Sequence, residues 1–154
     1  MKILVDDLSG PEIAGFLEAH LAQMREITPL ESKHALDLDG LRRPEVTFWT
    51  VRDGDAVVGC GALKRLDDTH AEVKSMRTAP ERRRSGIAAL VLSHIIAEAT
   101  RMGFRRLSLE TGSDDFFAPA RALYAKHGFT FCAPFADYRE DPHSVYMTRA
   151  LTPG

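Results

Sequence analysis

The sequence predicts an α/β fold in which about six or seven strands form one mixed, twisted sheet flanked by about four helices. Three observations lead to this class. Residues 46–51 and 56–63 alternate as strands around Asp53-Gly54, a typical hairpin turn. Residues 72–103 run from a strand through a short basic loop into a long amphipathic helix, and a second strand–helix pair follows at 106–127. We therefore expect antiparallel pairing early and parallel pairing where the two late helices cross over.

The remaining elements follow from periodicity and from start and stop signals. Ser9 and Glu12 mark the start of an amphipathic helix that Thr28-Pro29 ends, and a short helix or turn is expected over 30–40. The glycines on either side of Cys60 indicate a close backbone approach or a bulge. The other predicted elements are strands at 2–6, 70–78, 106–110, 128–131 and 145–151 and helices at about 86–103 and 115–127.

Composition and charge exclude several classes of protein. The 154 residues suit one domain over 1–154, and a net charge of −2 gives no reason to expect nucleic acid as a partner. No apolar run approaches the roughly 20 residues that span a bilayer, so no membrane partner is expected. Cys60 and Cys132 are predicted to be buried small hydrophobes in a reducing compartment, with the cytoplasm as the default. The histidines show no ligand spacing, so no metal is predicted.

The loop at 82–89 has the setting of a phosphate site. Ile87, Val91, Ile95 and Ala99 recur on one face of the helix that follows it, and Gly103 ends that helix. A loop before such a helix directs backbone N–H groups and the positive end of the helix dipole to one place, which suits a phosphate or pyrophosphate. The patterns of nucleoside-triphosphate loops and of dinucleotide folds are both absent.

Three motifs carry a family resemblance that covers nearly the whole chain. Residues 83–88, Arg-Arg-Ser-Gly-Ile-Ala, have the form [QR]-x-x-G-x-[GA] and resemble the acyl-CoA pyrophosphate loop of the GNAT superfamily of acetyl-CoA-dependent N-acetyltransferases. The strand ending in Met76-Arg77-Thr78 stands where that family has a bulged strand. Residues 120–129 are similar to the family's A-x-x-L-Y-x-K-x-G-F signature. The order of the elements also resembles the family.

The resemblance implies acetyl-CoA as the cofactor and assigns its contacts. Backbone groups of Met76, Arg77 and Thr78 would pair with the pantetheine arm, and the N–H of Met76 would stabilise the oxyanion. Phe117 occupies the place of a pantetheine-contacting asparagine, which puts that contact in doubt. The pyrophosphate would be held by Arg83, Arg84, Ser85, Gly86, Ile87, Ala88 and Ala89, with Arg82 adding charge. Gly86 lets the backbone approach the phosphates.

Two catalytic residues are implied by the same resemblance. Tyr124 occupies the place of the tyrosine that protonates the departing thiolate. Glu72 lies eleven residues before Arg83, the spacing of the glutamate base in histone-acetylating members. Glu72 would act directly or through a water; the alternative is a structural carboxylate paired with Lys74 or Arg106. Glu110, on the next strand, is the reserve candidate for the base.

The acceptor is predicted only as a class, the primary amine of a small molecule or peptide attacking directly within a ternary complex. Its pocket is expected from residues 25–36, the strands near Trp49 and residues 133–143. Glu31, Ser32 and His34 are the predicted substrate residues, and Arg25, Arg139 and His34 suggest an acceptor bearing a carboxylate. A protein-lysine acetyltransferase and a non-catalytic acyl-CoA-binding module stay open as alternatives. A homodimer through the C-terminal strands is common in similar proteins.

Overall fold

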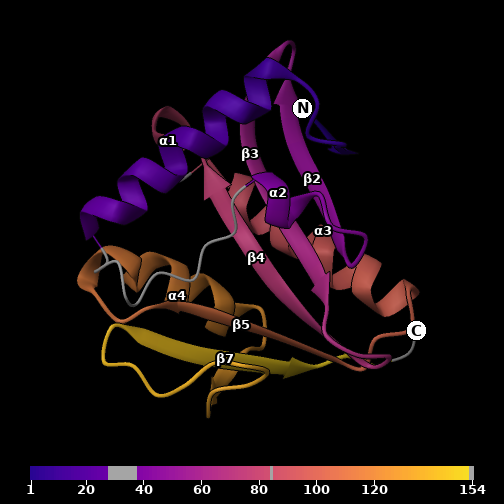
Figure 1. Ribbon diagram of the computed structural model, residues 1–154, viewed down its shortest axis with the longest axis vertical. Coiled ribbons are helices and arrows are strands. Elements are labelled where there is room, and N and C mark those ends of the chain that lie inside the picture. The colour runs from indigo at the N-terminus through magenta and orange to yellow at the C-terminus, as the bar shows by residue number, and fades with distance from the viewer. Residues whose placement is uncertain (28–37, 84, 153–154) are drawn as a thin grey trace.

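The computed structural model describes residues 1–27, 38–83 and 85–152, and it confirms the predicted fold class. One seven-stranded sheet has the order β1-β2-β3-β4-β5-β7-β6, with helices on both faces (Figure 1). The strands are β1 Lys2–Val5, β2 Val46–Asp53, β3 Ala56–Arg65, β4 His70–Thr78, β5 Arg106–Gly112, β6 Thr130–Cys132 and β7 Ser144–Ala150. The helices are α1 Pro11–Ile27, α2 Leu38–Leu41, α3 Ile87–Arg101 and α4 Ala118–Lys126, with 3₁₀ turns at Pro80–Arg82 and Asp115–Phe117.

The pairing of the strands is antiparallel except between β4 and β5, which the α3 crossover makes parallel. The second crossover, through α4, does not give a parallel pair. The last strand, β7, lies between β5 and β6 and pairs antiparallel with both. Our expectation of parallel pairing was therefore right for the α3 crossover and wrong for the α4 crossover. There, β7 lies between β5 and β6 and keeps them from pairing with each other.

Each face of the sheet has its own apolar core. On one face, α3 and α4 pack on the sheet through residues such as Val91, Ile95 and Tyr124. On the other face, α1 and α2 pack through Ile13, Leu17 and Leu41. Trp49 lies on the α3 face, buried edge-on against His94 with ring centroids 5.4 Å apart. Our expectation that the strands near Trp49 line the acceptor pocket was wrong for this side chain, because its position on β2 directs it to the opposite face.

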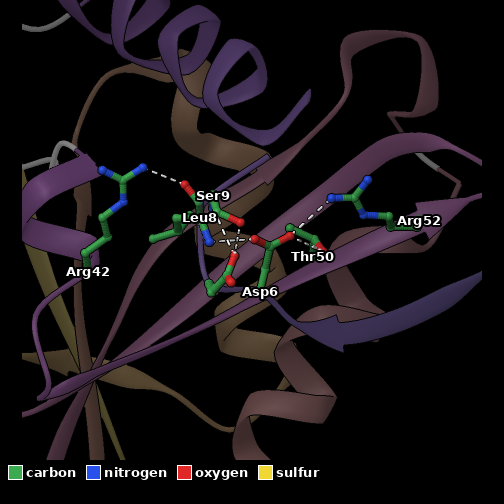
Figure 2. A network of polar contacts seen from close by, with 7 residues as sticks. Asp6, Leu8, Ser9, Arg42, Thr50 and Arg52 are labelled. Atoms are coloured by element: carbon green, nitrogen blue, oxygen red, sulfur yellow. Dashed lines mark hydrogen bonds and ion pairs between the residues drawn. The ribbon is translucent and has the colours of Figure 1, made fainter. Parts of the chain in front are cut away.

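The entry into α1 is held against β2 by the carboxylate of Asp6 (Figure 2). Asp6 accepts hydrogen bonds from the backbone N–H of Leu8 at 2.7 Å and from the Thr50 hydroxyl and Arg52 guanidinium at 3.2 Å each. Arg42, which follows α2, donates to the carbonyl of Leu8 at 2.6 Å. These bonds join the start of the chain to β2 and to the residue that follows α2, so the chain is anchored at the N-terminal end of α1.

The predicted bulge lies in β4, at Ser75 and Met76. Cys60 pairs with Arg77 and Ala62 with Lys74, so two residues of β4 face the single residue Gly61 of β3. Ser75 has the positive φ of 56° that the extra residue requires, and its carbonyl accepts the buried Cys60 thiol at 3.1 Å. Burial raises the pKa of this thiol to about 12, which keeps it a donor. Cys132, also predicted to be buried, is only half-buried.

The bulge coincides with the end of the parallel pairing. β4 and β5 pair only from His70–Arg106 to Val73–Leu109, although both strands continue beyond these residues. Beyond Val73, the edge of β4 that faced β5 has no strand partner among the described residues. An extended ligand that carries amide groups could form hydrogen bonds with that edge, as an added strand does.

Gly59 and Gly61 of β3 allow α3 to approach the sheet closely. A Cβ at Gly61 would lie 2.6 Å from Cγ1 of Val91 and 2.9 Å from Cδ1 of Ile95, distances that side-chain carbons do not tolerate. The close approach predicted from the glycines that flank Cys60 is thus present, as is the bulge.

We expect Gly61→Ala to lower the free energy of unfolding by about 1–3 kcal/mol, because the added methyl overpacks the interface of β3 and α3. Gly15→Ala is the control: Gly15 is an exposed residue of α1 whose Cβ would meet nothing within 4 Å, so this change should be neutral or stabilising. Urea unfolding of both variants measures the difference. Equal stability of the two would contradict the close-approach interpretation.

Candidate active site

The loop between β4 and α3 is fixed to the hairpin of β2 and β3. The N–H of Ala79 donates to the carbonyl of Val58 at 2.9 Å, and the 3₁₀ turn Pro80–Arg82 follows. Arg82 forms an ion pair with Asp53 at 2.9 Å, so its charge is already partnered and it adds less to a phosphate site than we expected. The side chain of Ser85 donates to the carbonyl of Arg82. These bonds hold the loop in place before the helix begins.

Gly86 begins α3 as its N-cap, at a φ of 87°. This left-handed conformation gives a second reason for glycine there, besides the open backbone that a phosphate needs. Ile87 directs its side chain into the core, so it can offer a ligand only its backbone N–H. Ala88 and Ala89 lie in the first turn of this fifteen-residue helix, and a pyrophosphate cradle at this helix start stays a prediction. Arg84 lies outside the described residues.

Aromatic rings stand beside this loop, at the entry to α4. The guanidinium of Arg83 lies over the ring of Phe116, 5.6 Å from its centroid. Phe117 packs against the end of β5: a Cβ on Gly112 would lie 2.1 Å from its ring. A phenyl ring can offer a cofactor only van der Waals contact, unlike the amide that the family often has there. Arg121 closes this segment by donating to the carbonyls of Gly112 and Asp114.

The side chain of Arg77 is directed to α1 rather than to the loop. It donates to Gln23 at 2.8 Å, lies over the ring of Phe16, and is 3.4 Å from Nδ1 of His20. Burial and the neighbouring charge of Arg77 lower the pKa of His20 to about 4, so the imidazole is neutral there. A cofactor contact from Arg77 would therefore come from its backbone, as predicted for Met76, whose side chain packs on the core.

Glu72 is buried on β4 and forms a cluster with Lys74 and Tyr138. Its Oε2 accepts a hydrogen bond from the Tyr138 hydroxyl at 2.5 Å and one from Nζ of Lys74 at 3.2 Å. Nζ of Lys74 also lies 2.9 Å from the Tyr138 hydroxyl, so each of the three groups contacts the other two. The ion pair with Lys74 that we considered as a structural role is present. Oε1 of Glu72 accepts no hydrogen bond from the described part of the chain, which leaves one oxygen for a substrate.

Tyr124 and Glu110 interact electrostatically within the site. Tyr124 is buried on α4, edge-on to Phe129, and its pKa is raised well above the usual range first by burial and then by the charge of Glu110. Burial also raises the pKa of Glu110 to about 7, partly offset by a hydrogen bond from Ser144 at 2.8 Å. The phenol therefore keeps its proton at neutral pH, and the carboxyl exchanges its proton near neutrality.

A pocket of about 970 Å³ opens beside the Glu72 cluster. Glu72, Lys74 and His70 of β4 line it, together with Glu45, the end of β3 with the turn after it, and residues 136–141. The described residues of its lining include six carboxylates and four basic side chains, a net formal charge of −2 with histidine neutral. Arg139 is among the basic residues, as predicted. The excess of carboxylates favours a cationic acceptor over the carboxylate-bearing one that Arg139 suggested.

Several predicted site residues lie outside the part of the chain that the structure describes, and the role of Tyr138 was underestimated. Glu31, Ser32 and His34 lie in the range 28–37, outside the described residues. Tyr138 was expected only to line the pocket, yet it contacts Glu72 directly. The alternation of β4 shows that Glu72 and Lys74 share a face, but no sequence signal places a residue 66 positions later against them.

The comparisons with known proteins identify the family of the chain and the relatives of its fold. Residues 7–129 match the model of the acetyltransferase (GNAT) family. The chain is 54% identical to a Bacillus subtilis protein named uncharacterized N-acetyltransferase YsnE, over 98% of this chain and 100% of that one. It is 50% identical to the Escherichia coli protein named uncharacterized N-acetyltransferase YedL, over 97% of this chain and 94% of that one. The crystal structure of a putative acyl-CoA N-acyltransferase from Klebsiella pneumoniae superposes with a TM-score of 0.78 at 27% identity, covering 98% and 97% of the two chains.

The chain therefore belongs to the GNAT family of acetyltransferases. It is an N-acetyltransferase, and acetyl-CoA is its cofactor. None of the helices in the described ranges has both the length and the apolar character of a membrane span. Within those ranges, no three His, Cys, Asp or Glu side chains are grouped to hold a metal ion.

The raised pKa of Glu110 predicts a pH-dependent contribution to stability. Between its ordinary value of 4.5 and about 7, the folded protein retains a proton that the unfolded chain releases, so stability falls as pH rises through this range. Glu110→Gln cannot ionise, so its stability relative to the wild type should increase over that range and level off above about pH 7.

The measurement is thermal unfolding of both proteins in buffers that cover this range. Glu98→Gln is the control: a hydrogen bond from Arg101 lowers the pKa of this half-buried carboxylate, so its difference from the wild type should stay constant there. A constant difference for Glu110→Gln as well would show that Glu110 has no raised pKa.

Proposed function

We propose that this chain transfers an acetyl group from acetyl-CoA to the primary amine of a small molecule or peptide, by direct attack within a ternary complex. The carrying observation is that β4 loses its pairing with β5 at its bulge while Glu72 lies on the same strand. One strand could thus pair with the donor along the edge that β5 leaves and present a carboxylate to the acceptor. We propose that residues 1–154 act as one domain, in the cytoplasm, as a homodimer.

The donor would be held mainly by backbone groups. The N–H groups at the start of α3, with the helix dipole behind them, suit the pyrophosphate of CoA. The unpaired edge of β4 offers hydrogen bonds to the amides of the pantetheine arm, and the N–H of Met76 would stabilise the oxyanion of the tetrahedral intermediate. In this proposed arrangement the thioester would lie next to the bulge, one to two residues beyond Lys74 on the same strand.

The transfer needs one proton removed and one supplied. An aliphatic ammonium has a pKa of roughly 10.4, so it must lose a proton before its nitrogen attacks the thioester carbon. We assign this step to Oε1 of Glu72, directly or through a water, with Glu110 as the alternative base. When the tetrahedral intermediate collapses, the C–S bond breaks and Tyr124 would protonate the thiolate. A buried site that raises the pKa of the phenol also makes an unprotonated thiolate costly, which favours the transfer.

The charge of the pocket narrows the chemical class of the proposed acceptor amine. A net formal charge of −2 on the described residues of the lining attracts an ammonium and disfavours an acidic amine. The spacing of Glu72 from the loop is the feature shared with protein-lysine acetyltransferases, so an exposed lysine remains within the proposed acceptor class. A panel of spermidine, tyramine and glutamate covers cationic, uncharged-tail and acidic acceptors.

Binding of the donor can be tested without an acceptor. We expect acetyl-CoA and CoA, but not ATP, to raise the melting temperature, because a ligand that binds the native state stabilises it by about 2.7 kcal/mol at a hundred times its Kd. Gly86→Ala should abolish this shift by placing a methyl group over the N–H groups of the cradle.

The matched control for that variant is Gly103→Ala, at the other end of α3. Both glycines have a positive φ and open space around them, so both variants should lose about 1–2 kcal/mol of stability from backbone strain. Only Gly86→Ala should lose the acetyl-CoA shift. A wild-type protein that responds to neither CoA species, or a Gly103→Ala protein that loses the shift equally, would contradict the assignment of the loop.

The general-acid role is tested with the panel amine that reacts fastest. Tyr124→Phe should lower kcat by about 100-fold or more, since a positioned acid contributes 10²–10⁴ in rate. The affinity for acetyl-CoA, measured by the thermal shift, should be nearly unchanged because the ring remains. An unchanged kcat would exclude Tyr124 as the acid.

A further inference from the structure

The segment after β6 reaches back across the sheet to contact Glu72 through one side chain, Tyr138. Its hydroxyl donates to Oε2 at 2.5 Å, a distance typical of a charge-assisted bond from a hydroxyl to a carboxylate. Nζ of Lys74 lies 2.9 Å from the same hydroxyl. Donors to Oε2 fix the plane of the carboxylate, and this determines where Oε1 is directed.

The ring of Tyr138 is itself held in place. It lies 5.1 Å from the ring of Phe135 and 5.4 Å from that of Tyr146, and Phe135 also packs against His70 of β4. The N–H of Tyr138 closes a turn onto the carbonyl of Phe135 at 3.0 Å, and Ala136 within this turn has a φ of 51°. A non-glycine residue keeps that conformation only where its surroundings impose it. The turn thus directs the Tyr138 hydroxyl at the sheet.

We propose that Tyr138 is a positioning residue for the transfer reaction: its hydroxyl, with Lys74, holds Glu72 so that Oε1 faces the acceptor amine in the pocket. This inference rests on the proposed function, in which Glu72 removes the proton from the amine. Residues 136–141 line the same pocket, so the segment that forms one wall for the acceptor also orients the base. The hydroxyl of Tyr138 therefore links the segment that lines the acceptor pocket to Glu72, the proposed base.

The test compares Tyr138→Phe with Tyr146→Phe. Both tyrosines pack in the same aromatic cluster, and both have hydroxyls that fasten the segment after β6, because Tyr146 donates to the carbonyl of Arg139 at 2.7 Å. Of these two hydroxyls, that of Tyr138 donates to Glu72, whereas that of Tyr146 donates to Arg139. With the panel amine that reacts fastest, Tyr138→Phe should lower kcat by roughly 10- to 100-fold, the loss expected from one hydrogen bond to a charged group. The KM for acetyl-CoA should stay the same, and Tyr146→Phe should keep its kcat.

A double-mutant cycle separates positioning from folding. In a Glu72→Gln background the Tyr138→Phe change should have almost no further effect on kcat, because its effect passes through the carboxylate. Urea unfolding of Tyr138→Phe and Tyr146→Phe shows whether both variants fold. Equal losses of kcat in the two variants, or a Tyr138→Phe loss that persists without the carboxylate, would overturn the proposal and leave the acetyltransferase assignment intact. Failure of the wild type to acetylate any panel amine would instead contradict the proposed function, and this inference with it.

A second measurement needs no acceptor. A hydroxyl proton in so short a bond should give a slowly exchanging, far-downfield proton resonance in the wild type. Tyr138→Phe and Glu72→Gln should each remove it, and Tyr146→Phe should keep it. A wild-type spectrum without this resonance would show that the contact on which the proposal depends is absent in solution.

Discussion

The extra residue in β4 is the constraint on which the rest of the site depends. The bulge at Ser75 and Met76 lies just beyond the end of the pairing with β5, and the groups that the proposed transfer uses lie on either side of this point. Glu72 and Lys74 precede it on the face toward α1, and the basic loop and α3 follow it. The bulge is possible because Gly61 opposite has no side chain, and the same glycine lets α3 pack closely behind. Gly61 therefore affects both the packing of the core and the shape of the site.

Two carboxylates on neighbouring strands have different surroundings. Glu72 is bound by a phenol and an ammonium, whereas Glu110 has one hydroxyl, that of Ser144, and burial raises its pKa to about 7. Pairs of acidic groups whose surroundings differ in this way can take different roles in proton transfer. One carboxylate is fixed in orientation, and the other exchanges a proton near neutral pH. The proposed mechanism uses the first as the base and leaves the second beside the phenol of Tyr124, where its charge affects the acid.

Local signals in the sequence were sufficient for most of the elements and for the loop between β4 and α3. Helical periodicity placed α3, glycines marked the approach of α3 and the bulge, and a six-residue motif marked the loop before α3. What could not be predicted depends on contacts between distant segments. The position of β7 between β5 and β6 depends on which strands, distant in the sequence, pair with each other. The face of the sheet on which Trp49 lies depends on the register of β2. The contact of Tyr138 with Glu72 joins residues 66 positions apart and has no local signature.

The unpaired edge of β4 has a consequence for how such a chain can diverge. Binding of the donor by main-chain amides, as proposed, depends little on which residues carry those amides. The side chains at 75–78 can therefore make other contacts. Arg77 illustrates this, since its guanidinium joins β4 to α1. The Klebsiella structure keeps the fold with a TM-score of 0.78 at only 27% identity. Donor use can therefore be inherited unchanged while the walls around the acceptor drift toward new amines.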